Sequence, residues 1–339
     1  MNRRGAKVLF HQRLVRLNGK LATGAERVKP GDVFQFPDPG DDAAVNAIAK
    51  ARAPRLTTPH GRQLVRIHED DHILVINKPA EVPVHRGQGG FTRRDTLEDV
   101  LDRAYPPHPA HSAGQRGYYF VHRLDMETSG CLLIARTEAA HDALTGDFAE
   151  RRMHKEYLAV VVGEVAWDKL IVRKPIAYVR EDDPLSERKR WLGRRPVMRG
   201  VKKGIALEEG DAAGKPCETH FKVVARYRGY TLLRAEPRTG RTHQIRVHLT
   251  AAGCTLAYDP LYGRRTPLRF REFDPHAGES EQGEKIVLNR LPLHAWKLGM
   301  QHPATNAYLM LEAPIPRDLR EFIRVLKRYR ALKTGMKQA

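Results

Sequence analysis

The chain has 339 residues, and its 59 Lys and Arg against 40 Asp and Glu give a formal net charge of +19 at pH 7. Its length suits one large domain with a smaller one, or two domains, and allows a core without disulfides. With 41% hydrophobic residues it is too apolar for global disorder, yet no run reaches the ~20 apolar residues of a membrane span. The sequence pI of about 10.0 favours a nucleic-acid partner over a surface kept soluble by charge.

The cysteines carry little chemical signal. Cys131, Cys217 and Cys254 are far apart, and no C-x-x-C is present, so the sequence shows neither a zinc ribbon nor a redox motif. An odd, sparse count suits a reducing compartment. The basic start, Met1–Arg4, is not followed by an apolar segment, so we expect a cytoplasmic protein without a secretory signal.

The first 60 residues predict a small module and a linker. Residues 14–20 form a strand pattern that enters an Asn-Gly turn, which is typical of a hairpin. Residues 28–34 repeat the pattern, with a Pro-Gly turn followed by a strand. We therefore expect a β-rich module over residues 1–37, a linker over 38–60 with its prolines and alanines, and a second domain over 61–339.

The second domain is predicted to be α+β. Continuous apolar runs indicate strands at 73–79, 131–135, 157–165, 219–226, 230–235, 293–298 and 308–312. Helical spacing indicates helices at 96–105, 138–148 and 242–252, and a final amphipathic helix around 319–326 with a basic tail. Residues 180–215 are predicted to be a charged loop or hairpin, and 263–288 a long polar loop. Strands outnumber helices without alternating regularly with them, which favours α+β.

Two clusters precede or begin predicted strands, and each has a simple structural explanation. In His122–Gly130, Asp125 stands just ahead of a buried strand. On spacing alone, an Asp that caps a turn is the better explanation. In Lys155–Ala159, Tyr157 begins a strand, where Tyr is favourable without any functional role.

Two further clusters lie nearer the C-terminus. In Arg238–Leu249, Arg241 falls at the start of a predicted helix, where a cation opposes the helix dipole and suggests a nearby carboxylate or phosphate. A solvated basic helix face explains the pattern equally well. His243 and His248 are five residues apart without a third ligand, so we expect no metal site. Leu293–Leu298, followed by His302-Pro303, is by itself a core strand and a turn.

Together and in this order, the clusters resemble the RluA-type family of RNA pseudouridine synthases. The resemblance covers roughly residues 61–325 and is strongest in His-Arg-Leu-Asp-x-x-Thr-Ser-Gly and Arg-Thr-His-Gln-Ile-Arg-x-His. The matching stretches are residues 73–79, 82–85, 122–130, 138–152, 155–159, 241–248, 259–263, 293–296 and 302–303. Met126 departs from the Lys or Arg that the family often has. The N-terminal module resembles the β half of an S4 RNA-binding domain, a truncated form.

The resemblance implies a fold and a reaction. The fold would be a central mixed, mostly antiparallel sheet with flanking helices and a cleft across its middle. The reaction breaks the N1–C1′ bond of a uridine, turns the uracil over and joins C5 to C1′. No atoms enter or leave, so we expect no cofactor, no metal and no energy source. RNA would be the partner, no membrane would be involved, and the enzyme would act as a monomer.

The resemblance also implies residue roles. Asp125 matches the family's nucleophile. Burial alone would raise the pKa of this carboxyl, and a cation within ~4–6 Å reverses that effect; Arg241 matches the arginine that pairs with it. Tyr157 matches a tyrosine that stacks on the uracil and helps to remove the C5 proton. Leu293 matches an apolar wall, and we expect substrate contacts from His122, Arg123, Lys155 and Arg246.

Several alternatives stay open at this point. Large-subunit ribosomal RNA is the first choice of substrate, because S4-bearing relatives usually modify it, and tRNA or both RNAs come second. A catalytically inactive RNA-binding protein is disfavoured by the intact set of Asp125, Tyr157 and Arg241. A glycoside hydrolase needs two carboxylates at ~5–9.5 Å. The charge of +19 and the single Asp of the motif disfavour this alternative, for which Glu127 is the only nearby second acid.

Overall fold

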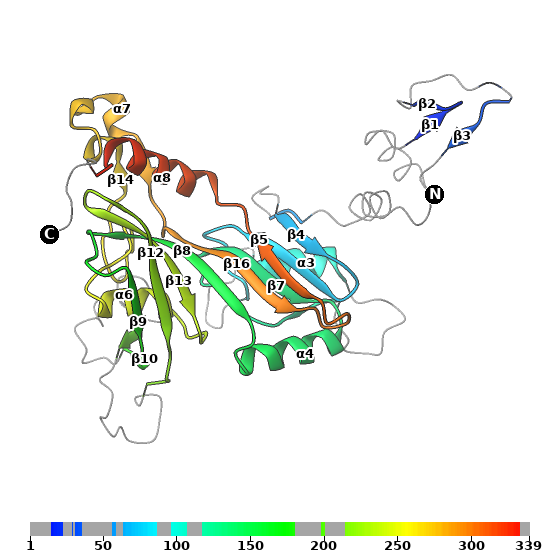
Figure 1. Cartoon of the computed structure of the whole chain (residues 1–339), viewed down its shortest axis with the longest axis horizontal. Coiled ribbons are helices and arrows are strands. Elements are labelled where there is room, and N and C mark those ends of the chain that lie inside the picture. Colours follow the sequence, from blue (N-terminus) through cyan, green and yellow to red (C-terminus); the bar gives the residue numbers. More distant parts are fainter. Residues whose placement is uncertain are drawn as a thin grey trace. The chain divides into compact units, whose positions relative to one another are not determined.

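The computed structural model describes residues 15–22, 29, 31–35, 56–58, 64–86, 96–106, 117–179, 198–200 and 214–332 (Figure 1). The chain divides into two compact units, Met1–Leu56 and Thr57–Ala339. This division falls within the predicted linker, of which only residues 56–58 are described. The proposed extent of the linker therefore stays a prediction.

The N-terminal unit contains a three-stranded antiparallel sheet in the order β2-β1-β3. The strands are β1 (Arg16–Leu17), β2 (Lys20–Leu21) and β3 (Phe34–Gln35). Asn18 and Gly19 join β1 to β2 with φ of 51° and 80°, which matches the primed turns that two-residue hairpins favour. The predicted Asn-Gly hairpin is confirmed. The Asn18 amide also donates to Asp32 at 2.7 Å and so links the hairpin to the chain before β3.

The second unit is built on a ten-stranded sheet. Its main path runs β4-β5-β7-β16-β8-β13-β12-β9, with β6 beside β7 and β17 beside β16. The strands are β4 (Val65–Glu69), β5 (Ile73–Lys78), β6 (Tyr119–Phe120), β7 (Ser129–Ala135), β8 (His154–Val162), β9 (Lys169–Val172), β12 (Thr219–Tyr227), β13 (Tyr230–Pro237), β16 (Leu293–Gln301) and β17 (Tyr308–Glu312). Within this sheet only β16 and β7 pair in parallel. The predicted mixed, mostly antiparallel α+β fold is confirmed.

The main helices of this unit are α3 (Leu97–Ala104), α4 (Glu138–Ala149), α6 (Gln244–Ala251) and α8 (Arg317–Tyr329). Local sequence explains where α3 and α4 begin. Thr96 and Asp99 form a capping box at α3, and the Thr137 side chain caps α4. Among the described helices, none is long and apolar enough to cross a membrane.

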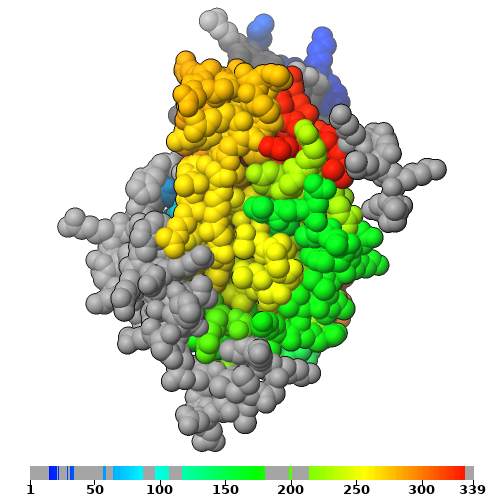
Figure 2. All heavy atoms as spheres, turned by 90° about the vertical axis from the view of Figure 1, so that its left-hand side faces the viewer, coloured from blue at the N-terminus to red at the C-terminus, as the bar shows by residue number. Residues whose placement is uncertain are grey.

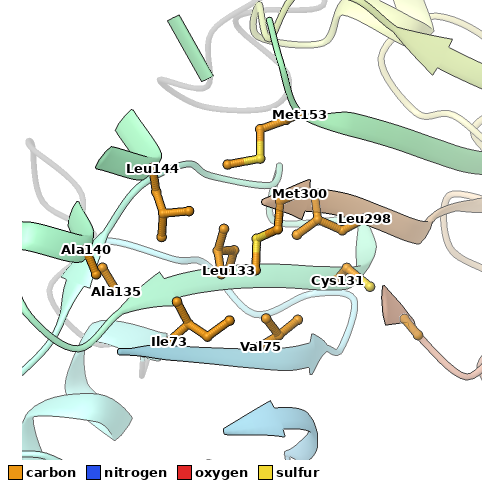
Figure 3. Close-up of a cluster of buried hydrophobic side chains, with 11 residues drawn as sticks. Ile73, Val75, Cys131, Leu133, Ala135, Ala140, Leu144, Met153, Leu298 and Met300 are labelled. Atoms are coloured by element: carbon orange, nitrogen blue, oxygen red, sulfur yellow. The ribbon is translucent and has the colours of Figure 1, made fainter. Parts of the chain in front are cut away.

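The helices cover both faces of the sheet (Figure 1). Ala140 and Leu144 of α4 pack on Leu133 and other buried side chains of β5, β7 and β16 (Figure 3). Further along the sheet, α6 covers the face that carries Ala159 and Leu233, while α8 covers the opposite face. Successive strand residues alternate between faces, so one strand serves both cores. Full burial of each such Leu or Val contributes about 1.5–3 kcal/mol.

The prediction of a long polar loop over residues 263–288 is wrong. The segment contains β14 (Leu268–Arg269), η2 (Phe270–Glu272), η3 (Pro275–Ala277), α7 (Glu281–Glu284) and β15 (Ile286–Leu288). Leu268, Phe273 and Leu288 anchor it against α8, but their spacing follows neither a helix nor a strand period. In Figure 2 the segment, yellow to orange, lies beside the red C-terminal helix.

The predicted excursion over residues 180–215 is described only at its base. There β10 (Ile176–Tyr178) pairs with β11 (Met198–Gly200) in antiparallel fashion. Residues 180–197 and 201–213 lie outside the described part of the chain.

Gly130 permits the parallel pairing that places the loop before β7 next to β16. Its φ is +123°, and an added Cβ would lie 2.1 Å from the carbonyl oxygen of Ala295 on β16. Gly229, in the β12–β13 turn, also has a positive φ of +76°, but a Cβ there would meet nothing within 4 Å.

Replacing Gly130 by Ala should therefore destabilise the protein far more than replacing Gly229 by Ala. The Gly229→Ala variant meets only the backbone penalty of a positive φ, about 1–2 kcal/mol, whereas Gly130→Ala must also separate two strands. Urea unfolding measures both changes. Equal losses for the two variants would contradict the close approach of β7 and β16.

Candidate active site

A cavity of about 420 Å³ opens between the two halves of the sheet, and each residue predicted for the site lines it. The wall comes from the loop before β7, the C-terminal end of α4, the start of β8, the segment that leads into α6, and the start of β16. The predicted residues on it are His122, Arg123, Asp125, Lys155, Tyr157, Arg241, Arg246 and Leu293. The fold thus gathers motifs that are up to 171 residues apart in the sequence.

A buried lysine fixes the loop that carries Asp125. Lys78, at the end of β5, is fully buried, and its Nζ donates to the carbonyl oxygens of Met126 at 3.0 Å and Val82 at 2.8 Å. The backbone N–H of Glu81 donates to the same Met126 oxygen at 2.8 Å. Burial lowers the pKa of Lys78 to about 7, against the attraction of Asp125 and other acids. The backbone of Met126, next to Asp125, is therefore fixed by two hydrogen bonds.

The Asp125 carboxylate faces the pocket and has no hydrogen-bond partner in the described part of the chain. Burial raises its pKa above the ordinary value, and the cations Arg246, Arg123 and Lys78 oppose that shift without cancelling it. A partly buried carboxylate without a hydrogen-bond donor among the described residues is able to contact a substrate directly.

Arg246 is the buried cation of the site. Its Nε and Nη2 donate to the two carboxylate oxygens of Asp259 at 2.9 and 2.7 Å. Both side chains are almost fully buried, at 2% and 1% exposure, and the guanidinium lies 4.9 Å from the ring centroid of Tyr262. Its Nη1 is buried without a partner. An unpaired donor of this kind is costly, so it is expected to bind an acceptor in the complete site.

The expectation that Arg241 pairs with Asp125 is not what the structure shows. Arg241 is exposed at the pocket rim and forms no ion pair with the described residues. The helix begins at Gln244 with His243 as N-cap, so Arg241 lies two residues before the cap, where its side chain is exposed. The strongest cationic influence on Asp125 comes from Arg246, which is carried by the first turns of α6 and points inward.

Tyr157 and Leu293 supply the less polar wall. Leu293 is buried, and Tyr157 packs against the same cluster. Burial, followed by the charge of Asp125, raises the pKa of Tyr157 well above its usual range. The phenol therefore stays protonated at neutral pH, and its stacking on the uracil stays a prediction. Its help in removing the C5 proton stays a prediction.

The predicted substrate contacts differ in character. Arg123 is exposed and free to reach a phosphate. His122 is fixed in the wall, because its Nε2 accepts the backbone N–H of Leu133 at 2.9 Å and burial lowers its pKa to about 3. Its ring stacks on Phe148, with centroids 4.8 Å apart. Lys155 lies beside the same ring, and burial lowers its pKa to about 8.

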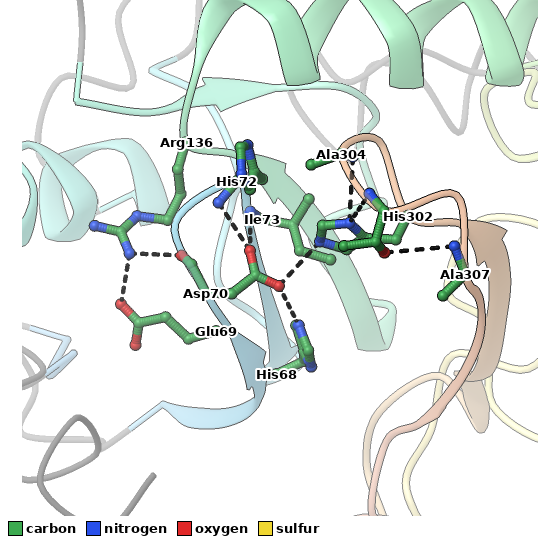
Figure 4. A network of polar contacts seen from close by, with 10 residues as sticks. His68, Glu69, Asp70, His72, Ile73, Arg136, His302, Ala304 and Ala307 are labelled. Atoms are coloured by element: carbon green, nitrogen blue, oxygen red, sulfur yellow. Dashed lines mark hydrogen bonds and ion pairs between the residues drawn. The ribbon is translucent and has the colours of Figure 1, made fainter. Parts of the chain in front are cut away.

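Outside this pocket, His68, Asp70 and His302 place metal-ligating atoms within 4.8 Å of one another (Figure 4). The Nδ1 of His302 accepts the backbone N–H groups of Ala304 and Thr305. Its proton is therefore on Nε2 and is donated to Asp70 at 3.1 Å, so this nitrogen has no lone pair for a metal. Asp70 also accepts two backbone N–H groups of its own turn. The hydrogen bond between His302 and Asp70 links the β16–β17 turn to the β4–β5 turn.

Comparison with known proteins decides the family. Residues 72–251 match the family model of RNA pseudouridylate synthases. The chain belongs to this family, and it is an RNA pseudouridine synthase. It is 34% identical to ribosomal large subunit pseudouridine synthase C of Escherichia coli strain K12, over 92% of this chain and 86% of the relative. It is also 34% identical to ribosomal large subunit pseudouridine synthase D of Nitrosomonas europaea, over 77% and 64%.

A solved structure shares the fold. Human RNA pseudouridylate synthase domain containing 4 aligns with a TM-score of 0.53 and 23% identity, over 77% of this chain and 92% of that one.

Sequence reasoning assigned no role to Lys78, Asp259 or Phe148, although all three lie in stretches that resemble the family. The signals were an Asn-Lys-Pro that ends a buried strand and an Asp-Pro-Leu-Tyr-Gly turn. A Lys inside an apolar strand is rarely buried without a purpose. An Asp ahead of two backbone N–H donors can hold a buried cation, as Asp259 does here.

Replacing Asp125 by Asn should raise the thermal unfolding midpoint more at pH 8 than at pH 4, close to the ordinary aspartate pKa of 3.8. Burial raises the folded-state pKa above the unfolded value, so the wild type loses stability as pH rises toward the folded pKa. Asn stays neutral and avoids this loss. Differential scanning fluorimetry at the two pH values measures the effect. A variant less stable than wild type at pH 8 would show that the cations overcompensate the burial.

Replacing Arg246 by Lys should slow single-turnover pseudouridine formation at least tenfold, while Arg241→Gln should mainly weaken RNA binding. Lys carries all its donors on one nitrogen and cannot bind Asp259 in the bidentate way while it presents a donor where Nη1 of Arg246 lies. A lost charge-assisted hydrogen bond of about 1.5–3 kcal/mol corresponds to roughly 10–100-fold in rate. Single-turnover assays at saturating RNA separate the two effects. A larger rate loss for Arg241→Gln than for Arg246→Lys would instead support the predicted pairing of Arg241 with Asp125.

Proposed function

We propose that this enzyme converts specific uridines of large-subunit ribosomal RNA to pseudouridine, with Asp125 as the nucleophile. The observation that carries the proposal is the Asp125 carboxylate itself, unpaired within the described residues, in a pocket whose buried arginine has a free Nη1. The synthase C and D relatives named above support the choice of RNA. We propose that the enzyme acts in the cytoplasm, as a monomer, without a metal or a cofactor.

The proposed reaction is balanced within the substrate. Asp125 attacks the target nucleoside at the sugar or the base, the N1–C1′ bond breaks, and the uracil turns. C5 then bonds to C1′, and the bond between Asp125 and the nucleoside breaks, which frees the carboxylate. Asp125 then acts as the base that takes the C5 proton, while N1 gains one. Arg246 donates from Nη1 to the oxygen on which charge develops, and Tyr157 and Leu293 flank the ring.

The target uridine must leave its stack to reach Asp125. Extrusion costs a few kcal/mol, and less from a loop or a single strand. Arg123 and Arg241 are exposed at the rim, where they can bind phosphates and offset this cost. The net charge of +19 supplies the longer-range attraction.

Deleting the gene should remove a pseudouridine from large-subunit ribosomal RNA, and only wild-type protein should restore it. Carbodiimide-based mapping of total RNA compares the deletion strain complemented with wild type or with Asp125→Ala. Because the carboxylate forms the transient covalent bond, the Asp125→Ala protein should restore no site. Lost sites confined to tRNA would overturn the ribosomal target. Restoration by Asp125→Ala would overturn the nucleophile.

A further inference from the structure

The pocket extends beyond the reacting residues, toward the C-terminal end of α4. There its wall is formed by Thr145, Phe148 and Ala149 of the helix, together with Val121 and Lys155. None of the proposed chemical steps uses this wall. A cavity of about 420 Å³ falls in the range of pockets that bind ligands larger than a single pyrimidine ring.

Phe148 and His122 form a rigid platform on this wall. Their rings lie 4.8 Å apart and are inclined by only 26°. The hydrogen bond from the Leu133 N–H fixes the orientation of His122, and its pKa of about 3 keeps the ring neutral. A fixed, uncharged aromatic pair is the kind of surface on which nucleobases stack.

Lys155 adds a donor that is short of acceptors. Its Nζ lies 5.8 Å from the Phe148 ring centroid. Within the described chain its one hydrogen bond goes to the carbonyl oxygen of Thr239 at 3.4 Å, a long contact. An ammonium group has three N–H donors. A partly buried ammonium with one weak acceptor is stabilised by any oxygen that enters the pocket beside it.

We propose that Phe148 and Lys155 form a subsite for the nucleotide next to the target uridine. The base of that nucleotide stacks on Phe148, and one of its oxygens, a base keto group or a phosphate, accepts from Lys155. The inference rests on the proposed function, because extrusion of the target brings its chain neighbour to the same pocket. A keto group at Lys155 would favour guanine or uracil at this position.

The test measures whether the effect of replacing Phe148 or Lys155 on KM depends on the nucleotide next to the target uridine. Synthetic stem-loops of large-subunit ribosomal RNA carry the uridine whose modification is lost on gene deletion, with the 5′ or 3′ neighbour intact, abasic, or linked by a methylphosphonate. The enzymes are wild type, Phe148→Leu, Phe148→Tyr and Lys155→Met. Phe120→Leu is the control, because Phe120 packs edge-on against His85 and Tyr118 and does not line the pocket.

Phe148→Leu should raise KM roughly tenfold on intact RNA, as expected for one lost stack, and leave KM nearly unchanged on the RNA with the abasic neighbour. Phe148→Tyr keeps the aromatic face and should keep the wild-type KM. Lys155→Met should lose its effect on abasic RNA if its acceptor is the base, and on methylphosphonate RNA if it is the phosphate. Phe120→Leu should affect all RNAs equally.

Equal KM changes for Phe148→Leu on intact and on abasic RNA, for both neighbours, would overturn the subsite and leave Phe148 a structural residue. An unchanged KM on intact RNA would overturn it as well. Failure of the wild-type enzyme to convert any of the RNAs would instead overturn the proposed function, and the subsite with it.

Discussion

The site depends on keeping a carboxylate buried next to buried cations. Burial raises the pKa of the Asp125 carboxyl, which we propose as the nucleophile, and the nearby cations oppose that shift. Burial of a cation is itself unfavourable, so each buried cation needs hydrogen-bond acceptors of its own. Lys78 has backbone carbonyl oxygens as its acceptors, and Arg246 has Asp259. Much of the local architecture of the pocket follows from these requirements.

The geometry of arginine explains why Arg246 suits this role. Its planar guanidinium uses two donors for the carboxylate of Asp259 and presents a third in another direction. Burial raises the pKa of Asp259, but Arg246 outweighs this effect and keeps that pKa below its ordinary value. The backbone N–H groups of Leu261 and Tyr262 donate to the same carboxylate and lower the pKa further. The bidentate contact with Asp259 therefore fixes the orientation of the Arg246 guanidinium.

Much of the fold could be predicted because its signals are local. The Asn-Gly turn, the caps of α3 and α4, and apolar runs such as that of β5 each depend on a few neighbouring residues. The choice between Arg241 and Arg246 is not local, because both lie in one motif and only the packing of α6 turns one of them inward. The structure of residues 263–288 is not predictable from local sequence for the same reason, since Phe273 and Leu288 are buried against α8, which comes from a later part of the chain. The role of Phe148 also depends on a partner, His122, from another element.

The most direct test of this account is a titration of the Asp125 carboxyl by ¹³C NMR in the free enzyme, with the signal assigned by its loss in Asp125→Asn. The account predicts a midpoint above the ordinary aspartate value of 3.8, and a further upward shift when Arg246 is replaced by Met. A midpoint at or below the ordinary value would show that the cations outweigh burial. That result would contradict the central claim.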